Sequence, residues 1–317
     1  MPESRIIYYI LIIIHLTESL KLKILYDESL NDRGKLYRAI LWVFVMLISF
    51  LTMAVAAREL SNTFNAFQII FFRTITAFVI VVIFIAPSFP RTIMIRRVKI
   101  QIFRNVIHYC GNLAWIIGVG LIPLAQVFAL EFTIPIWVAM MAVFFLKEEM
   151  TIGKLVAIAF GFAGVLVVLR PGLVTIEIGS ISVLIASLAF AIAFVITKSL
   201  TEDNSPLAIL FWMFGMQLPI SAIGGIYVWI TPEWSHLPWI ICIGTTALTA
   251  HYSMVRALAL ADVTVILPID FIRMPLIAVI GFFFYAEPFS IWIFFGAVLI
   301  FTGNYFNIYF EHKKLRN

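Results

Sequence analysis

The chain alternates between long apolar runs and short polar connections. The apolar runs are about 20 residues long, which is the length a helix needs to cross a hydrocarbon core about 30 Å thick. Because backbone polar groups find no water in lipid, we expect each run to be helical. The predicted spans lie at about 37–57, 66–86, 105–122, 125–146, 152–169, 179–198, 206–230, 237–259, 263–285 and 289–310.

A shorter apolar run, residues 6–16, precedes the first predicted span. It is too short to cross the membrane, and no small-residue cleavage site follows it, which argues against a signal peptide. We expect an interfacial helix here, with a start-site artefact or a disordered tail as alternatives. The predicted organisation is an N-terminal segment at 1–36, two halves at 37–172 and 177–310, and a cytoplasmic tail at 311–317.

Composition supports the membrane interpretation and excludes the common soluble classes. Hydrophobic residues make up 63% of the chain and charged residues 12%, whereas soluble domains carry roughly 45–50% and about 25%. A water-exposed surface could not be covered with so few charges, and the net charge of +5 does not indicate a nucleic-acid partner. The two cysteines, Cys110 and Cys242, lie inside apolar runs, which excludes a disulfide scaffold. The sequence therefore predicts an all-α polytopic membrane protein.

Lysine and arginine gather on one side of the predicted membrane, and only Arg58 and Arg170 lie on the other. The positive-inside rule then places both termini in the cytoplasm, and we expect a bacterial inner membrane. The residues on the cytoplasmic side are Lys21, Lys23, Arg33, Lys35, Arg38, Arg91, Arg96, Arg97, Lys99, Arg104, Lys147, Lys154, Lys198, Lys313, Lys314 and Arg316.

The two halves of the chain resemble each other at a fixed offset of about 139 residues over 127–164. Two acids and a glycine recur at this offset: Glu131 on Asp270, Glu148 on Glu287 and Gly164 on Gly303. Since each half holds an odd number of spans, the second half enters the membrane inverted. Inverted repeats are common in secondary transporters, whose substrate site lies near mid-membrane between the repeats. A chance match within apolar sequence is the alternative.

Several motifs resemble the EamA branch of the drug/metabolite transporter superfamily over nearly all of 37–310. They are the FFR of Phe71-Phe72-Arg73, the segments 104–112 (RNVIHYCGN) and 122–137 (IPLAQVFALEFTIPIW), and the LKEE of 146–149. Pro135 and Gly164 match the family's spacing around Glu148. The second half keeps Glu287 and Gly303, but its prolines are spaced differently. The resemblance implies ten helices in two inverted five-helix repeats and a solute carrier, without naming a substrate.

Five charged residues fall inside predicted spans, where a charge costs about 2.5–3.5 kcal/mol and usually faces a cavity or a partner. They are Arg73, Glu131, Arg256, Asp270 and Arg273. Asp270 and Arg273 share a helix face, so they line the substrate path or simply pair with each other. Glu131 is expected to bind substrate or a coupling proton, or to be a counter-ion for an arginine. Both acids are flanked by helix-kinking prolines, namely Pro123, Pro135, Pro268 and Pro275.

Other polar and aromatic residues have less certain roles. Trp115 and Trp137 are candidates for the floor of the site, or for ordinary packing. Arg256 either binds an anionic group or extends to the interface. Arg104 is expected to be a positive-inside anchor. Glu148 and Glu287 end the fourth and ninth predicted spans, where we expect capping or gating contacts. Two isolated histidines are expected in the core, with a proton relay as the alternative: His108 and His251.

Small residues recur every seven positions in the fifth and tenth predicted spans, as Ala157/Gly164 and Gly296/Gly303. Such stripes allow two helices to approach closely. They predict either a contact inside the protein or a dimer surface, so monomer and homodimer both remain open.

These features predict a secondary transporter that works by alternating access. Arginines and carboxylates in one site suit a small polar or zwitterionic, amino-acid-like metabolite, and we expect export, with uptake or exchange as the alternative. A proton is the candidate coupling ion, and no metal or cofactor is expected. The chain lacks a phosphate-binding loop and hydrolase or zinc-protease motifs, which argues against ATP drive and an enzyme. A receptor or scaffold without transport is the remaining alternative.

Overall fold

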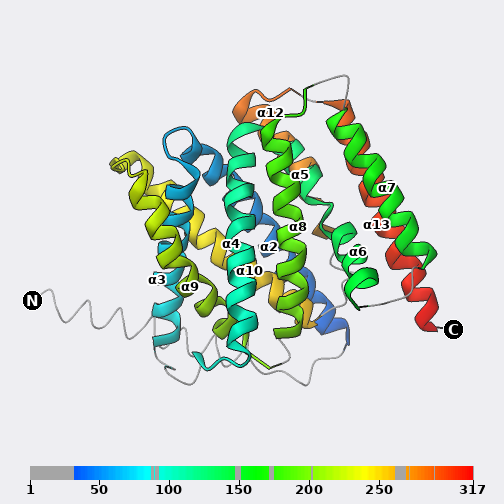
Figure 1. Ribbon diagram of the computed structural model, residues 1–317, viewed down its shortest axis with the longest axis horizontal. Coiled ribbons are helices and arrows are strands. Elements are labelled where there is room, and N and C mark those ends of the chain that lie inside the picture. Colours follow the sequence, from blue (N-terminus) through cyan, green and yellow to red (C-terminus); the bar gives the residue numbers. More distant parts are fainter. Residues whose placement is uncertain are drawn as a thin grey trace, which may run out of the picture.

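The computed structural model describes residues 32–86, 89, 93–146, 151–170, 175–200, 203–260, 269–270, 272–288 and 290–316. Within these residues every regular element is a helix (Figure 1). The N-terminal apolar run at 6–16 and Glu148 lie outside the described residues. The helices are α2 (Asp32–Ser61), α3 (Ala66–Ile85), α4 (Val98–Leu121), α5 (Leu124–Glu131), α6 (Ile134–Leu146), α7 (Ile152–Leu169), α8 (Ile178–Leu200), α9 (Pro206–Tyr227), η3 (Trp234–His236), α10 (Leu237–Leu260), α12 (Arg273–Tyr285) and α13 (Ile291–Arg316).

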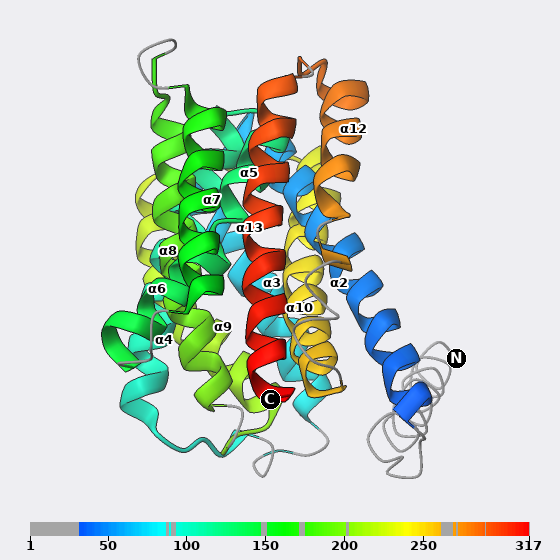
Figure 2. The same cartoon turned by 90° about the vertical axis from the view of Figure 1, so that its right-hand side faces the viewer.

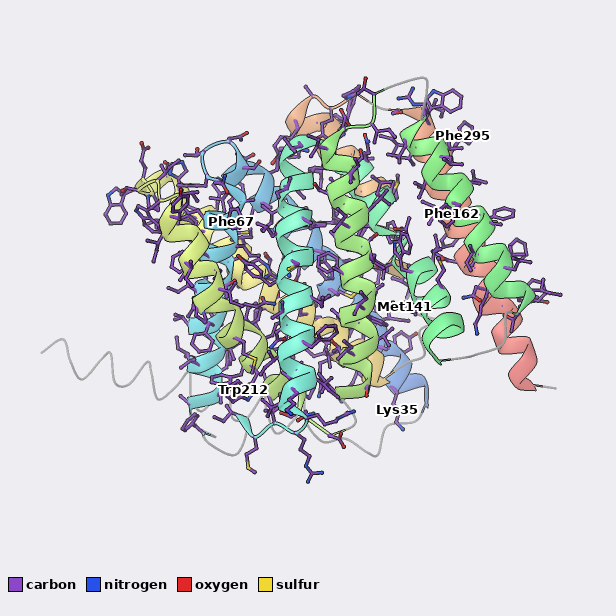
Figure 3. All side chains as sticks on the ribbon, viewed as in Figure 1. Lys35, Phe67, Met141, Phe162, Trp212 and Phe295 are labelled. Atoms are coloured by element: carbon purple, nitrogen blue, oxygen red, sulfur yellow. The ribbon has the colours of Figure 1, made fainter. Side chains whose placement is uncertain are left out.

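The helices follow the predicted spans closely. Among the described residues, five helices are long and apolar enough to cross a membrane: Tyr37–Ser61, Ala66–Ile85, Ile152–Leu169, Ile178–Thr197 and Pro206–Tyr227. Helices α4 and α10 have 24 residues each but carry inward-facing polar side chains that lower their hydropathy. Apolar side chains cover the outside of the bundle, as Phe162 and Phe295 illustrate (Figure 3). This surface suits contact with lipid tails.

The four most extensive helix contacts each join a helix of the first half to a helix of the second. They are α7 with α13, α2 with α10, α4 with α8, and α3 with α9 (Figures 1 and 2). The equivalent helices of the two halves are α2 and α8, α3 and α9, α4 and α10, and α7 and α13. If each helix is replaced by its equivalent, the α2–α10 pair becomes the α8–α4 pair, and the α7–α13 and α3–α9 pairs remain the same. The packing therefore has the two-fold pattern that inverted repeats require.

Helices α7 and α13 meet through the small-residue stripes. A Cβ atom added to Gly164 would lie 2.6 Å from the Gly296 carbonyl oxygen, and one added to Gly296 would lie 2.7 Å from the Gly164 carbonyl oxygen. Farther along the pair, a Cβ on Gly303 would lie 3.1 Å from the Ala157 carbonyl oxygen. The stripes thus form a contact inside the protein, so for these residues the first of the two predictions holds and the dimer surface does not.

The fourth predicted span is broken into α5 and α6. Helix α5 ends at Glu131, Phe132 and Thr133 form a turn, and α6 begins at Ile134. Pro135 cannot donate a helical hydrogen bond, which explains a break rather than the smooth kink we expected. The Asn304 amide of α13 donates to the Phe132 carbonyl at 3.3 Å. A broken helix at membrane depth is tolerated where the protein itself satisfies the freed backbone, and such breaks often lie beside a transport site.

Candidate substrate site between the two halves

The two repeat-related acids meet on one arginine. The Arg273 guanidinium, at the start of α12, donates from Nη2 to Asp270 Oδ2 at 2.6 Å and from Nη1 to Glu131 Oε1 at 3.5 Å. Asp270 is thus the tighter partner, but Glu131 reaches the same cation from the other half of the chain. All three side chains are at most 12% exposed. With two carboxylates and one guanidinium, the three side chains together carry one formal negative charge.

Three phenyl rings surround the same guanidinium. Its carbon lies 4.8 Å from the ring centroid of Phe50 on α2, 5.4 Å from Phe128 on α5 and 5.3 Å from Phe132 at the helix break. Cations are attracted to aromatic faces at these distances, and the attraction strengthens when water is excluded. We call Phe50, Phe128 and Phe132 the aromatic cage. It shows that this position between the halves accommodates a delocalised cation.

Trp115 of α4 fixes the position of Glu131. Its indole Nε1 donates to Glu131 Oε2 at 2.8 Å, so each carboxylate oxygen of Glu131 has one donor. By contrast, Asp270 Oδ1 and Arg273 Nε are buried without a hydrogen-bond partner. Polar atoms without partners are costly in a protein interior. The cluster is therefore held in place on one side and has unused hydrogen-bonding capacity on the other.

A second polar cluster lies beyond Phe50. The Phe50 ring is 5.9 Å from the His251 ring of α10, and His251 Nε2 is 3.3 Å from Arg73 Nη2 of α3. The His251 ring also lies 5.2 Å from the His108 ring of α4, so the two histidines are not isolated as the sequence had suggested. Arg104 is only 4% exposed, so the prediction that it is an interfacial anchor was wrong.

An ion pair ties the halves together at the face that holds the α2–α3 turn. We call this the outer face, following the predicted orientation. Arg58 Nη2, near the end of α2, lies 2.9 Å from Glu287 Oε1 and also donates to the Ile122 carbonyl. Glu287 Oε2 accepts from the Leu124 N–H at 2.8 Å. Nearby, the Tyr285 hydroxyl donates to Glu59 Oε1 at 2.8 Å. These contacts, the outer lock, join the start of α5 to the α12–α13 connection.

Loss of the Glu287 charge is expected to open the outer lock. Glu287→Gln removes the ion pair with Arg58, and charged hydrogen bonds of this kind contribute about 1.5–3 kcal/mol. Because the lock holds the outer face closed, the closed arrangement should lose roughly a 10- to 100-fold preference over one that is open at this face. A cysteine placed at the fully buried Val127 should then react several-fold faster with a membrane-impermeant thiol reagent. Glu177→Gln, which alters an exposed acid at the same face, is the control; equal labelling rates in both variants would contradict the lock.

Burial raises the pKa of the Glu287 carboxyl, although the Leu124 N–H and Arg58 favour its charged form. The ion pair with Arg58 is consequently lost as the pH falls through this raised pKa. Because thiol reagents react with the thiolate, each rate is divided by that of an exposed cysteine at the same pH. This relative rate should rise as the pH is lowered for the protein with Glu287 intact and change little for Glu287→Gln.

Comparison with known proteins identifies the family of this chain. The EamA-like transporter family matches residues 37–170 and again 177–309. The chain belongs to the EamA-like transporter family. This membership confirms the expected fold, an all-helical membrane protein of ten helices in two related halves, and it makes the chain a secondary transporter of a small metabolite rather than an enzyme.

Individual relatives of this EamA-like chain include transporters of two metabolites. An S-adenosylmethionine uptake transporter of Rickettsia bellii is 24% identical over 287 residues, which cover 90% of this chain and 99% of the relative. A riboflavin transporter of Rhizobium johnstonii is 29% identical over 218 residues, which cover 67% of this chain and 71% of the relative. A crystal structure that is 13% identical superimposes with a TM-score of 0.63 over 88% of this chain and 99% of the other chain, and supports the fold alone.

The remaining predicted site residues of the EamA-like chain lie at different places. Trp137 of α6 donates to Ser187 Oγ of α8 at 2.9 Å, and Thr133, next to the cage residue Phe132, donates to the same oxygen at 2.9 Å. The Arg256 guanidinium carbon lies 5.9 Å from the Trp42 ring of α2. The cage phenylalanines and Arg58 are not among the site residues that the sequence predicts. Phe50, for example, is one of many phenylalanines in apolar runs, and no local signal distinguishes it.

Proposed function

We propose that the chain imports a small metabolite that carries both a positive centre and a carboxylate, of the S-adenosylmethionine kind. The observation that carries the proposal is the position of the Arg273 guanidinium within the aromatic cage and beside Glu131 and Asp270. Phenyl rings and carboxylates are the chemistry that binds a sulfonium or ammonium group. The substrate cation would take up the contacts that Arg273 makes in this state.

The direction of transport is proposed from the relatives. The Rickettsia relatives are named as uptake transporters, which supports the uptake alternative over the export that the sequence alone had suggested. We also propose that both termini face the cytoplasm of a bacterial cell, because the lysines and arginines outside the spans gather on that side. For uptake, a coupling proton has to move inward together with the substrate, and we propose that Glu131 is the carboxylate that carries it.

Uptake assays distinguish this substrate from the riboflavin of the other relatives. Cells that express the chain should accumulate labelled S-adenosylmethionine several-fold faster than cells with an empty vector, and purified protein in liposomes should catalyse its counterflow. Excess unlabelled S-adenosylmethionine should compete, whereas riboflavin, which has no positive centre, should not. Counterflow of riboflavin alone, or export of label from preloaded cells without uptake, would overturn the proposal.

A further inference from the structure

Two buried arginines, Arg73 and Arg104, lie within electrostatic range of each other and of both histidines in the second polar cluster. Arg73 is 1% exposed and Arg104 is 4% exposed. Arg104 donates only to neutral acceptors, Thr197 Oγ1 at 2.9 Å and Asn105 Oδ1 at 3.1 Å. Within the part of the chain that the structure describes, no acidic side chain forms an ion pair with either arginine. Two uncompensated positive charges at this depth are costly, so the arrangement favours an anion from outside the chain.

Several donors in this cluster have no partner. Two of the three guanidinium nitrogens of Arg73, Nε and Nη1, are buried without a hydrogen bond. Because an arginine can only donate, His251 accepts the contact from Arg73 through Nε2, and the neutral ring therefore carries its hydrogen on Nδ1. That Nδ1 is also buried without a partner. Free donors beside buried positive charge are the groups that bind a carboxylate.

The cluster adjoins the cation position. The Phe50 ring contacts the Arg273 guanidinium on one side and the His251 ring on the other. On α4, His108 of this cluster and Trp115 of the Glu131 cluster are separated by seven residues, a rise of about 10 Å. A simple α-amino acid carries both charges on one carbon and cannot reach both clusters. A metabolite whose positive centre and carboxylate are separated by a short chain can do so.

We propose that Arg73, Arg104 and His251 form an anion subsite that binds the carboxylate of the transported metabolite, across Phe50 from the cage that binds its positive centre. This subsite rests on the proposed function, because it completes the same substrate site. It assigns a binding role to Arg104 and His251, and it narrows the substrate class to zwitterions with separated charges. The carboxylate would take hydrogen bonds from Arg73 and His251, and Arg104 would add its charge.

The test compares two probes that differ only in the carboxylate, S-adenosylmethionine and its decarboxylated analogue, on purified full-length protein. Arg73→Gln and Arg104→Gln should each weaken binding of S-adenosylmethionine roughly 10- to 100-fold, the range expected for a lost charged hydrogen bond. Neither substitution should weaken the decarboxylated analogue. Arg73→Lys, which keeps the charge, should retain part of the preference. Lys99→Gln removes an exposed charge from α4, the helix that carries Arg104, and serves as the control. Equal losses for both probes, or no loss for either, would overturn the subsite.

A second measurement does not depend on the substrate. Acetate should raise the melting temperature of the wild type at constant ionic strength, and Arg73→Gln should abolish the rise. If the wild type binds neither nucleoside probe, the proposed substrate fails, and this acetate response alone decides the subsite. A response to chloride or phosphate that equals or exceeds the response to acetate would assign the cluster to an inorganic anion and overturn the carboxylate assignment. An identical response in the wild type and Arg73→Gln would also overturn it.

Discussion

The Glu131→Gln variant is expected to lose substrate counterflow almost completely while it still inserts and purifies like the wild type. Glu131 contributes one of the two carboxylates at the cation position, and the amide that replaces it carries no charge. A charged hydrogen bond contributes about 1.5–3 kcal/mol, so loss of the charge should reduce substrate affinity roughly 10- to 100-fold, and flux falls with it. Counterflow of labelled S-adenosylmethionine in liposomes measures the effect.

The fold should survive the Glu131 substitution because Arg273 keeps its closer partner, Asp270, at 2.6 Å. The glutamine side-chain oxygen can still accept from the Trp115 indole. Asp270→Asn provides the matched variant from the other half, and it should be equally inactive although it removes the closer partner. Glu177→Gln, at an exposed acid, should transport normally. Wild-type flux in both Glu131→Gln and Asp270→Asn would reject this position as the substrate site.

The Gly296→Leu variant should lose much of its stability, because the added side chain has no room between α7 and α13 and would push the two helices apart. A Cβ atom at Gly296 would lie 2.7 Å from the Gly164 carbonyl oxygen and 2.4 Å from Val168 Cγ2. The first contact is with backbone, which cannot rotate away. Overpacking of this kind typically costs about 1–3 kcal/mol, which corresponds to a fall in melting temperature on the order of 5–10 °C.

Thermal unfolding of the detergent-purified protein, followed by size-exclusion chromatography, measures this loss. Gly120→Ala is the control, since its Cβ would meet only the Ser61 side chain, 3.3 Å away at Cβ. The control should melt within a degree or two of the wild type. If the Gly296→Leu protein melts at the same temperature as the Gly120→Ala control, the α7–α13 contact tolerates separation and the prediction is wrong.

The sequence predicted the spans well because hydropathy and helix length are local properties. It also predicted that Glu131 and Asp270 are equivalent, because a repeat offset can be read along the chain. It did not predict that both acids meet on Arg273, which depends on how the halves dock. The cage depends on the same docking: Phe50 comes from α2 and Phe132 from a helix break, and nothing in their neighbouring residues marks them.

The errors have similar physical causes. Arg104 lies six residues into α4, near enough to the end for an interfacial position, but contact of α4 with α8 buries it beside Thr197. His108 and His251 appear isolated in the sequence because 142 positions separate them, and only the packing of α4 and α10 around α3 brings their rings to 5.2 Å. Both errors came from judging a side chain by its neighbours in the sequence, where packing against a distant helix decides its surroundings.

The pairing of helices across the halves has a consequence for biogenesis. Leu47 of α2 packs with Ala257 of α10 in one apolar cluster, yet about 210 residues must be synthesised between them. At ribosomal rates of about 5–20 residues per second, α2 waits roughly 10–40 s for its partner. During that delay the early helices expose their future contact faces to lipid or to the insertion machinery. We therefore expect slow translation or truncation after the first half to leave the nascent protein open to membrane proteases.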